Sequence, residues 1–195
     1  MKVGMIFECG PEGPDKKVCE HLALRINSGI QISSVTLDNK KNLVNECGKA
    51  ASTLLEEGCD QIIIIWDLHP NWRTSKPCRK EDCETIHESL KNEGVPIEQV
   101  KLVCIEEELE AWLIADEKVI SEHLSRPTNK VKFKKVKKPE QKKNPKAHLI
   151  KNFKELSGRM YNDLIDAEKI IKREPDLKSL RRCSSFVRFE VFISA

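Results

Sequence analysis

Within its first half the chain reads Ile62-Ile63-Ile64-Ile65-Trp66-Asp67. An apolar run without polar alternation predicts a strand that is buried on both faces, as in the centre of a parallel sheet covered by helices. The run ends at Asp67, and a carboxylate at the end of so buried a strand is expected to be partly desolvated and to need a partner.

Two further apolar runs also lead into acidic residues. Residues 3–7 are followed directly by Glu8, and residues 100–105 are followed by Glu106-Glu107-Glu108 and Glu110. The glutamates after residue 105 are expected to open a helix, where acidic side chains in the first turn are stabilising by about 0.3–1 kcal/mol each.

The segments between these runs repeat apolar residues at helical spacing. Helices are predicted from about residues 15, 40 and 79, a more exposed strand over residues 30–37, and a long loop over residues 68–78. This alternation predicts an α/β fold with a Rossmann-like parallel sheet of about four strands flanked by helices.

The second part of the chain has a different pattern. Residues 1–124 are expected to form the α/β domain, residues 125–143 a basic linker or loop, and residues 144–195 a small helical C-terminal region. Pro145 suits the first position of a helix, and Gly158 suits its end.

Composition limits the class of protein. At 39% hydrophobic residues the chain can bury a core, and it has no apolar run of the ~20 residues that a membrane span requires. Eight scattered cysteines without a CxxC pair, and no apparent signal peptide, lead us to expect a cytoplasmic protein with no membrane association.

The acidic strand ends predict a metal site. The carboxyl ends of parallel strands share one edge of a sheet, so Glu8 and Asp67 are expected to meet there, joined by Glu108 or Glu110. Clustered carboxylates suit Mg²⁺ or Mn²⁺. His69, two residues after Asp67, is a candidate ligand or proton carrier.

A zinc site is an alternative for the neighbouring segment. If residues 79–92 are helical, Cys83 and His87 share one face, and Cys78 and His69 lie nearby in the sequence. The spacing of the two cysteines is longer than that of a usual zinc knuckle.

Charge is divided unevenly along the chain. Residues 1–124 carry 14 Lys and Arg against 23 Asp and Glu, whereas residues 125–195 carry 20 against 8. The basic part includes a run of lysines that is expected to bind the phosphate backbone of a nucleic acid, the alternative being a solvated surface loop. These residues are Lys134, Lys135, Lys137, Lys138, Lys142 and Lys143.

The chain resembles the DUF4276 family, which is regarded as TOPRIM-like. The resemblance rests on the strand ending at Glu8 with its glycine turn, the strand ending at Asp67, and the string Glu108-Leu109-Glu110-Ala111-Trp112. It continues through Asn144-Pro145-Lys146, Tyr161 and residues 181–186, so it covers nearly the whole chain.

TOPRIM domains occur in primases, topoisomerases and nucleases of defence systems. The resemblance implies that Glu8 is the glutamate after the first strand and Asp67 the first aspartate of a pair after the third. His69 stands where the second aspartate is expected, and Glu108 or Glu110 is a candidate to replace it.

Two functions follow as hypotheses. The first is a nuclease-like enzyme of genome defence that uses Mg²⁺ or Mn²⁺ to cleave phosphodiesters of nucleic acid. Its catalytic candidates are Glu8, Asp67, His69, Glu108 and Glu110. The second is a non-catalytic regulatory module that binds nucleic acid or protein and keeps a degenerate metal site.

Overall fold

The computed structural model describes residues 1–70 and 76–194, and it divides into two compact units. The first unit comprises Met1–Cys104 together with the chain from Glu190 onward, and the second comprises Ile105–Phe189. Residues 71–75, which belong to the predicted loop, lie outside the described residues.

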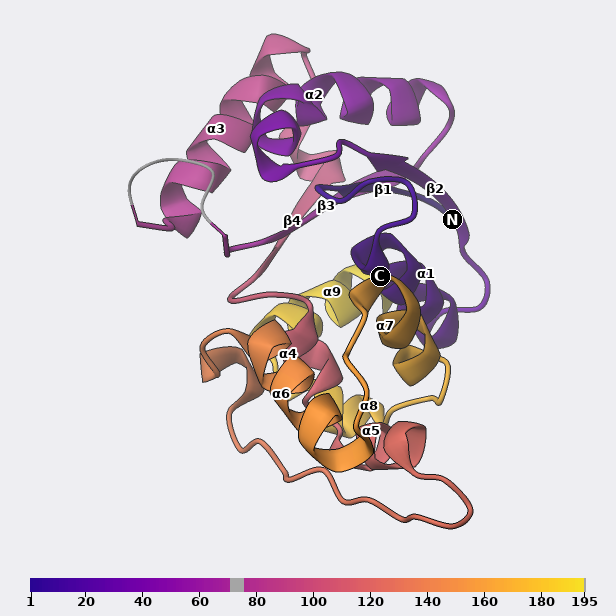
Figure 1. The fold of residues 1–195 in the computed structure, drawn as a ribbon. Coiled ribbons are helices and arrows are strands. Elements are labelled where there is room, and N and C mark those ends of the chain that lie inside the picture. Colours follow the sequence, from indigo (N-terminus) through magenta and orange to yellow (C-terminus); the bar gives the residue numbers. More distant parts are fainter. Residues whose placement is uncertain (71–75, 195) are drawn as a thin grey trace. The chain divides into compact units, whose positions relative to one another are not determined.

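The first unit is built around one sheet. Its elements follow in the order β1 (Lys2–Phe7), α1 (Pro14–Ile26), β2 (Gln31–Thr36), α2 (Lys40–Glu56), β3 (Gln61–Asp67), α3 (Arg79–Asn92), η1 (Ile97–Gln99) and β4 (Val100–Ile105). The four strands form a parallel sheet in the order β2-β1-β3-β4, with α2 and α3 on one face and α1 on the other (Figure 1). The α/β fold predicted from the sequence is confirmed.

Strand β3 is buried on both faces, as its isoleucines predicted. Ile62, Ile64 and Trp66 belong to the core that α2 and α3 cover. Ile63 and Ile65 point to the opposite face, because successive side chains of a strand alternate, and they are equally inaccessible. The strand therefore has no solvated face, and this places it in the interior of the sheet.

The second unit is helical. Its elements are α4 (Glu110–Leu113), α5 (Glu117–Leu124), η2 (Pro139–Gln141), α6 (Pro145–Ser157), α7 (Asp163–Ile171), α8 (Leu177–Leu180) and α9 (Ser184–Ser194), the last of which continues into the first unit. The predicted helical C-terminal region is confirmed. Helix α6 begins at Pro145 and ends before Gly158, which has the left-handed conformation expected at such an end.

One expectation for this region was wrong. The helix after β4 was predicted to begin at the first glutamates, but α4 begins at Glu110 and spans only four residues. Trp112 on this helix is a core residue: its ring contacts Phe186 and Phe189, and its Nε1 donates a hydrogen bond of 2.8 Å to Ser185 Oγ.

Across residues 1–70 and 76–194, no helix combines the length and the apolar composition needed to cross a bilayer.

Helices α2 and α3 approach each other closely at Gly48. A Cβ atom added there would lie 2.1 Å from the backbone oxygen of Ser89, and the Gly48 N–H donates to Ser89 Oγ at 3.0 Å. Ser89 Oγ in turn donates to the carbonyl of Asn45 at 2.8 Å. This contact fixes the helix pair that covers β3.

We expect Gly48→Ala to destabilise the first unit. Alanine gains up to about 1 kcal/mol over glycine in a helix interior, but here the methyl group meets a rigid backbone, and overpacking of this kind costs about 1–3 kcal/mol. Chemical denaturation should show a net loss of stability. Gly29→Ala is the control, because a Cβ atom added there would lie 3.4 Å from its nearest neighbour, the side-chain oxygen Oδ1 of Asn27. Equal stability of Gly48→Ala and wild type would show that the helices separate freely.

Candidate active site

The carboxylates that follow β1 and β3 lie at the same edge of the sheet. Phe7 pairs with Ile65 in the parallel register. Glu8 comes one residue after Phe7 and Asp67 two residues after Ile65, so both lie just beyond the same paired position. The chain crosses from β1 to β2 on one side and later returns to β3 on the other, which makes this edge a topological switch point. Ligands of open α/β sheets bind at such points.

Glu8 is held in a desolvated position. Its Oε2 atom is inaccessible to solvent and has no hydrogen-bond partner among the described residues. Burial, and after it the negative charge of Asp15, raise the pKa of Glu8 to about 8, while Lys40 and the backbone N–H of Asp67, which donates to the carboxylate, lower that pKa. The hydrogen bond from Asp67 shows that the two strand ends are in contact.

A cavity of about 350 Å³ opens beside Glu8. It lies between the loop after β1 and the start of α2. Its lining residues are Glu8, Cys9, Asp15, Asp38, Asn39, Lys40, Lys41 and Pro70. Carboxylates therefore share the cavity with two lysines at the beginning of a helix.

The loop between Glu8 and α1 is shaped by a tight turn. The Gly13 N–H donates to the carbonyl of Gly10 at 2.8 Å, and a Cβ atom on Gly13 would lie 2.4 Å from Cys9 Cβ. The turn therefore requires glycine at position 13. It brings Asp15, in the first turn of α1, to the cavity wall.

Lys40 is a member of the site that the sequence did not reveal. Its side chain is buried, and Nζ donates hydrogen bonds to the carbonyls of Leu68 at 2.7 Å and Pro70 at 3.1 Å. Nζ also lies 3.9 Å from Oδ2 of Asp82, which accepts a 3.3 Å hydrogen bond from Trp66 Nε1. Lysine is rarely buried, and only the tertiary structure could reveal this arrangement.

The Lys40 contacts order the chain that follows Asp67. His69 lies between the two residues whose carbonyls accept from Lys40, and it is half-buried. The histidine lies two residues after Asp67, and its role as a ligand or proton carrier stays a prediction.

The other two predicted carboxylates belong to the second unit and have contacts there. Glu110 is 4% exposed, and its Oε1 accepts a hydrogen bond from the Tyr161 hydroxyl at 3.1 Å. Oε2 of Glu108 accepts from the Lys146 N–H at 3.1 Å, which caps the start of α6. Each of these two acidic side chains therefore has a structural contact within the second unit. Their convergence with Glu8 and Asp67 stays a prediction.

The predicted nucleic-acid-binding lysines also lie in the second unit. Lys134, Lys135, Lys137, Lys138 and Lys143 are exposed, and Lys142 is half-buried. They occupy the irregular segment between α5 and α6.

A comparison with protein-family models finds one match. The family described as "Domain of unknown function (DUF4276)" matches residues 15–193. The chain belongs to the DUF4276 family. The matched range includes Asp67, Glu108 and Glu110 but begins after Glu8. No curated protein and no solved structure matches the chain significantly.

The donor set of this DUF4276 chain limits the kind of metal site that it can form. Within the described ranges, no group of three or more His, Cys, Asp or Glu side chains is placed to hold a metal ion, and this applies equally to Cys78, Cys83 and His87. Mg²⁺, however, is commonly held by one or two carboxylates, with waters and substrate phosphates completing its shell. Glu8 and Asp67 fit that pattern, because the Asp67 N–H donates to the Glu8 carboxylate, and Glu8 lines a cavity and retains a buried oxygen.

We expect Glu8→Gln to change the pH dependence of stability. The ordinary glutamate pKa is 4.5 and that of Glu8 in the folded chain is about 8. As the pH rises from 4.5 to 8, the unfolded chain loses this proton while the folded chain keeps it, so wild type loses stability over that interval. Glutamine stays neutral and escapes the loss.

The variant should therefore match wild type near pH 4.5 and exceed it at pH 9 by at least about 1.4 kcal/mol, the free energy of one pKa unit. Denaturation in EDTA at several pH values measures the difference. Glu12→Gln is the control, because Glu12 lies in the same loop with a side chain 84% exposed. A constant difference between Glu8→Gln and wild type across pH would contradict the raised pKa.

Proposed function

We propose that this DUF4276 protein cleaves phosphodiester bonds of nucleic acid with the help of a divalent metal ion. The observation that carries the proposal is the meeting of Glu8 and Asp67 at the switch point of the sheet, beside a cavity of about 350 Å³. Negative charges crowded there in low dielectric are unfavourable unless a cation offsets them.

Glu8 and Asp67 would hold Mg²⁺ or Mn²⁺, and the ion would polarise the phosphoryl oxygen and lower the pKa of an attacking water. Lys40 and His69 have further roles in the proposed site. Lys40 holds the residues directly after Asp67 through the carbonyls of Leu68 and Pro70. His69, which is one of these residues, is a candidate for moving a proton.

The resemblance to TOPRIM domains supports the same assignment. It equates Glu8 with their glutamate and Asp67 with their first aspartate, whereas His69 replaces the second. Glu108 and Glu110 remain candidates for the missing carboxylate, although each already has a partner in the second unit. A cytoplasmic location and a role in genome defence belong to the same proposal.

A second function is a non-catalytic module that binds nucleic acid or protein. Lys40 favours it, because a buried ammonium already supplies positive charge beside Glu8 and Asp82. A site that carries its own cation has less need of a metal. Turnover by the purified protein under Mg²⁺ or Mn²⁺ separates the two functions.

We expect wild type to bind Mn²⁺ weakly and Asp67→Ala to lower the affinity at least tenfold, because a hard cation requires carboxylate oxygens. Asp60→Asn is the matched control: Asp60 precedes β3, at the opposite end of the strand from Asp67, and accepts a hydrogen bond from the Lys2 N–H at 2.7 Å. Calorimetric titration at pH 8.5 measures the affinity.

Cleavage is measured in the same preparations with a labelled 20-base-pair DNA and a labelled RNA. Loss of both Mn²⁺ binding and cleavage in Asp67→Ala, with both kept in Asp60→Asn, supports the enzyme. Equal Mn²⁺ affinity in wild type and Asp67→Ala would place the ion elsewhere. Mn²⁺ binding without cleavage by wild type would favour the non-catalytic module.

A further inference from the structure

The lysine-rich segment over residues 130–140, here named the basic strap, is tied to the second unit at several points. The Val131 N–H donates to Ser125 Oγ at 3.1 Å, and the Phe133 N–H donates to Ser121 Oγ at 2.9 Å. Both serines lie on or directly after α5. The strap has no regular secondary structure before η2, so the two serine hydroxyls accept hydrogen bonds from backbone N–H groups that no helix or sheet pairs.

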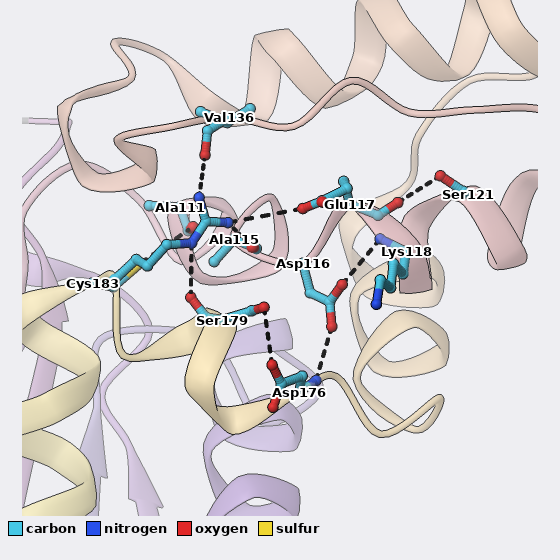
Figure 2. A network of polar contacts seen from close by, with 11 residues as sticks. Ala111, Ala115, Asp116, Glu117, Lys118, Ser121, Val136, Asp176, Ser179 and Cys183 are labelled. Carbon is cyan, nitrogen blue, oxygen red and sulfur yellow. Dashed lines mark hydrogen bonds and ion pairs between the residues drawn. The ribbon is translucent and has the colours of Figure 1, made fainter.

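Arg182 fixes the middle of the strap through Val136. The carbonyl of Val136 accepts a 2.6 Å hydrogen bond from Arg182 Nη1, and Val136, Ala115 and Ser179 gather around this guanidinium in Figure 2. Arg182 also donates to the carbonyls of Ala115 and Ser179.

Glu140 closes the strap by capping α9. Its carboxylate accepts hydrogen bonds from the backbone N–H groups of Ser184 at 2.6 Å and Ser185 at 2.8 Å. The hydroxyls of both serines also donate to it. A carboxylate at a helix N-terminus satisfies otherwise unpaired donors and is favoured by the helix dipole.

The anchored residues alternate with exposed lysines. Phe133, Pro139 and Glu140 are buried, whereas the five lysines between Val131 and Pro139 are exposed: Lys132, Lys134, Lys135, Lys137 and Lys138. Across the described part of the chain, no carboxylate lies within ion-pair distance of any of these five. The strap therefore presents unpaired positive charge on a backbone that is already ordered.

The outward face of the strap lacks groups for other kinds of recognition. Its aromatic residue, Phe133, is fully buried and packs edge-on against His148, with ring centroids 5.7 Å apart. It is therefore unavailable for stacking on an unpaired base, which single-strand binding proteins use. Association with a membrane surface generally adds apolar side chains to basic ones, and the apolar residues of the strap are buried or half-buried.

We propose that the basic strap binds the phosphate backbone of a duplex polynucleotide, without contacts to the bases. The inference rests on the proposed function for its substrate class and specifies the form of that substrate. Lys132 and Lys138 are six residues apart, so the segment between them spans at most about 22 Å at 3.3–3.6 Å per residue. A duplex carries one phosphate per about 1.7 Å of its axis, so about a dozen phosphates lie along that length, and a duplex offers the denser target.

The test is binding of a fluorescent 20-base-pair DNA, measured by anisotropy in EDTA at several salt concentrations. The strap variant replaces Lys134, Lys135, Lys137 and Lys138 by glutamine. The control variant removes the same charge from four exposed lysines on helices: Lys49, Lys80, Lys91 and Lys154. Because EDTA prevents metal-dependent cleavage, failure of the proposed enzyme would leave this result unaffected.

We expect the strap variant to bind at least tenfold more weakly at about 0.1 M salt and the control to change little. The slope of log affinity against log salt should flatten by up to about 0.9 for each lysine that contacts a phosphate. Changing the DNA sequence should have little effect, since the contacts are to phosphates. Thermal unfolding verifies the fold, and Lys134→Gln with Lys135→Gln serves as the second variant if the fourfold change unfolds the chain.

Three results would overturn the proposal. An equal loss in the control variant would show a general effect of net charge. Tighter binding of a single strand than of a duplex of equal phosphate number would show base stacking. Strap-dependent binding to vesicles that contain phosphatidylserine, without binding to the duplex, would identify a membrane surface as the partner.

Discussion

The burial of β3 on both faces is the constraint on which the first unit depends. Four consecutive isoleucines can be covered only by a helix layer on each side, and this holds the strand in the interior of the sheet next to β1. The ends of both strands are then fixed relative to each other. Glu8 and Asp67 are neighbours because β1 and β3 pair in parallel within the sheet, and not because the carboxylates attract each other.

Much of this could be predicted from local pattern. Strand ends, helix starts and the approach of Glu8 to Asp67 follow from periodicity and from the geometry of parallel sheets. Lys40 and Asp82 were missed, because each resembles an ordinary charged residue at the beginning of a helix. Their burial depends on the packing of α2, α3 and the loop after β3, and a single sequence contains no local signal for that packing.

The acidic run after β4 shows that a sequence pattern can also suggest a site where the side chains have structural roles. Its density suggested a metal site, yet two of its members have structural contacts: Glu108 caps α6, and Glu110 accepts from Tyr161. A carboxylate that caps a helix 38 residues away is indistinguishable in sequence from one that binds a cation. The basic strap is a similar case, since its lysines were recognised as a group, whereas its anchoring through Phe133 and Glu140 required the structure.

Inward and outward side chains alternate along the strap, and substitutions at the two sets of positions have different effects. Residues that fix its path point inward, and residues that set its charge point outward, so changes at the outward positions leave the backbone contacts untouched. Charge at this surface can therefore change by single substitutions without loss of the fold. For protein engineering, the five outward positions of the strap are those at which new side chains, such as acidic or aromatic ones, are expected to leave the backbone contacts in place.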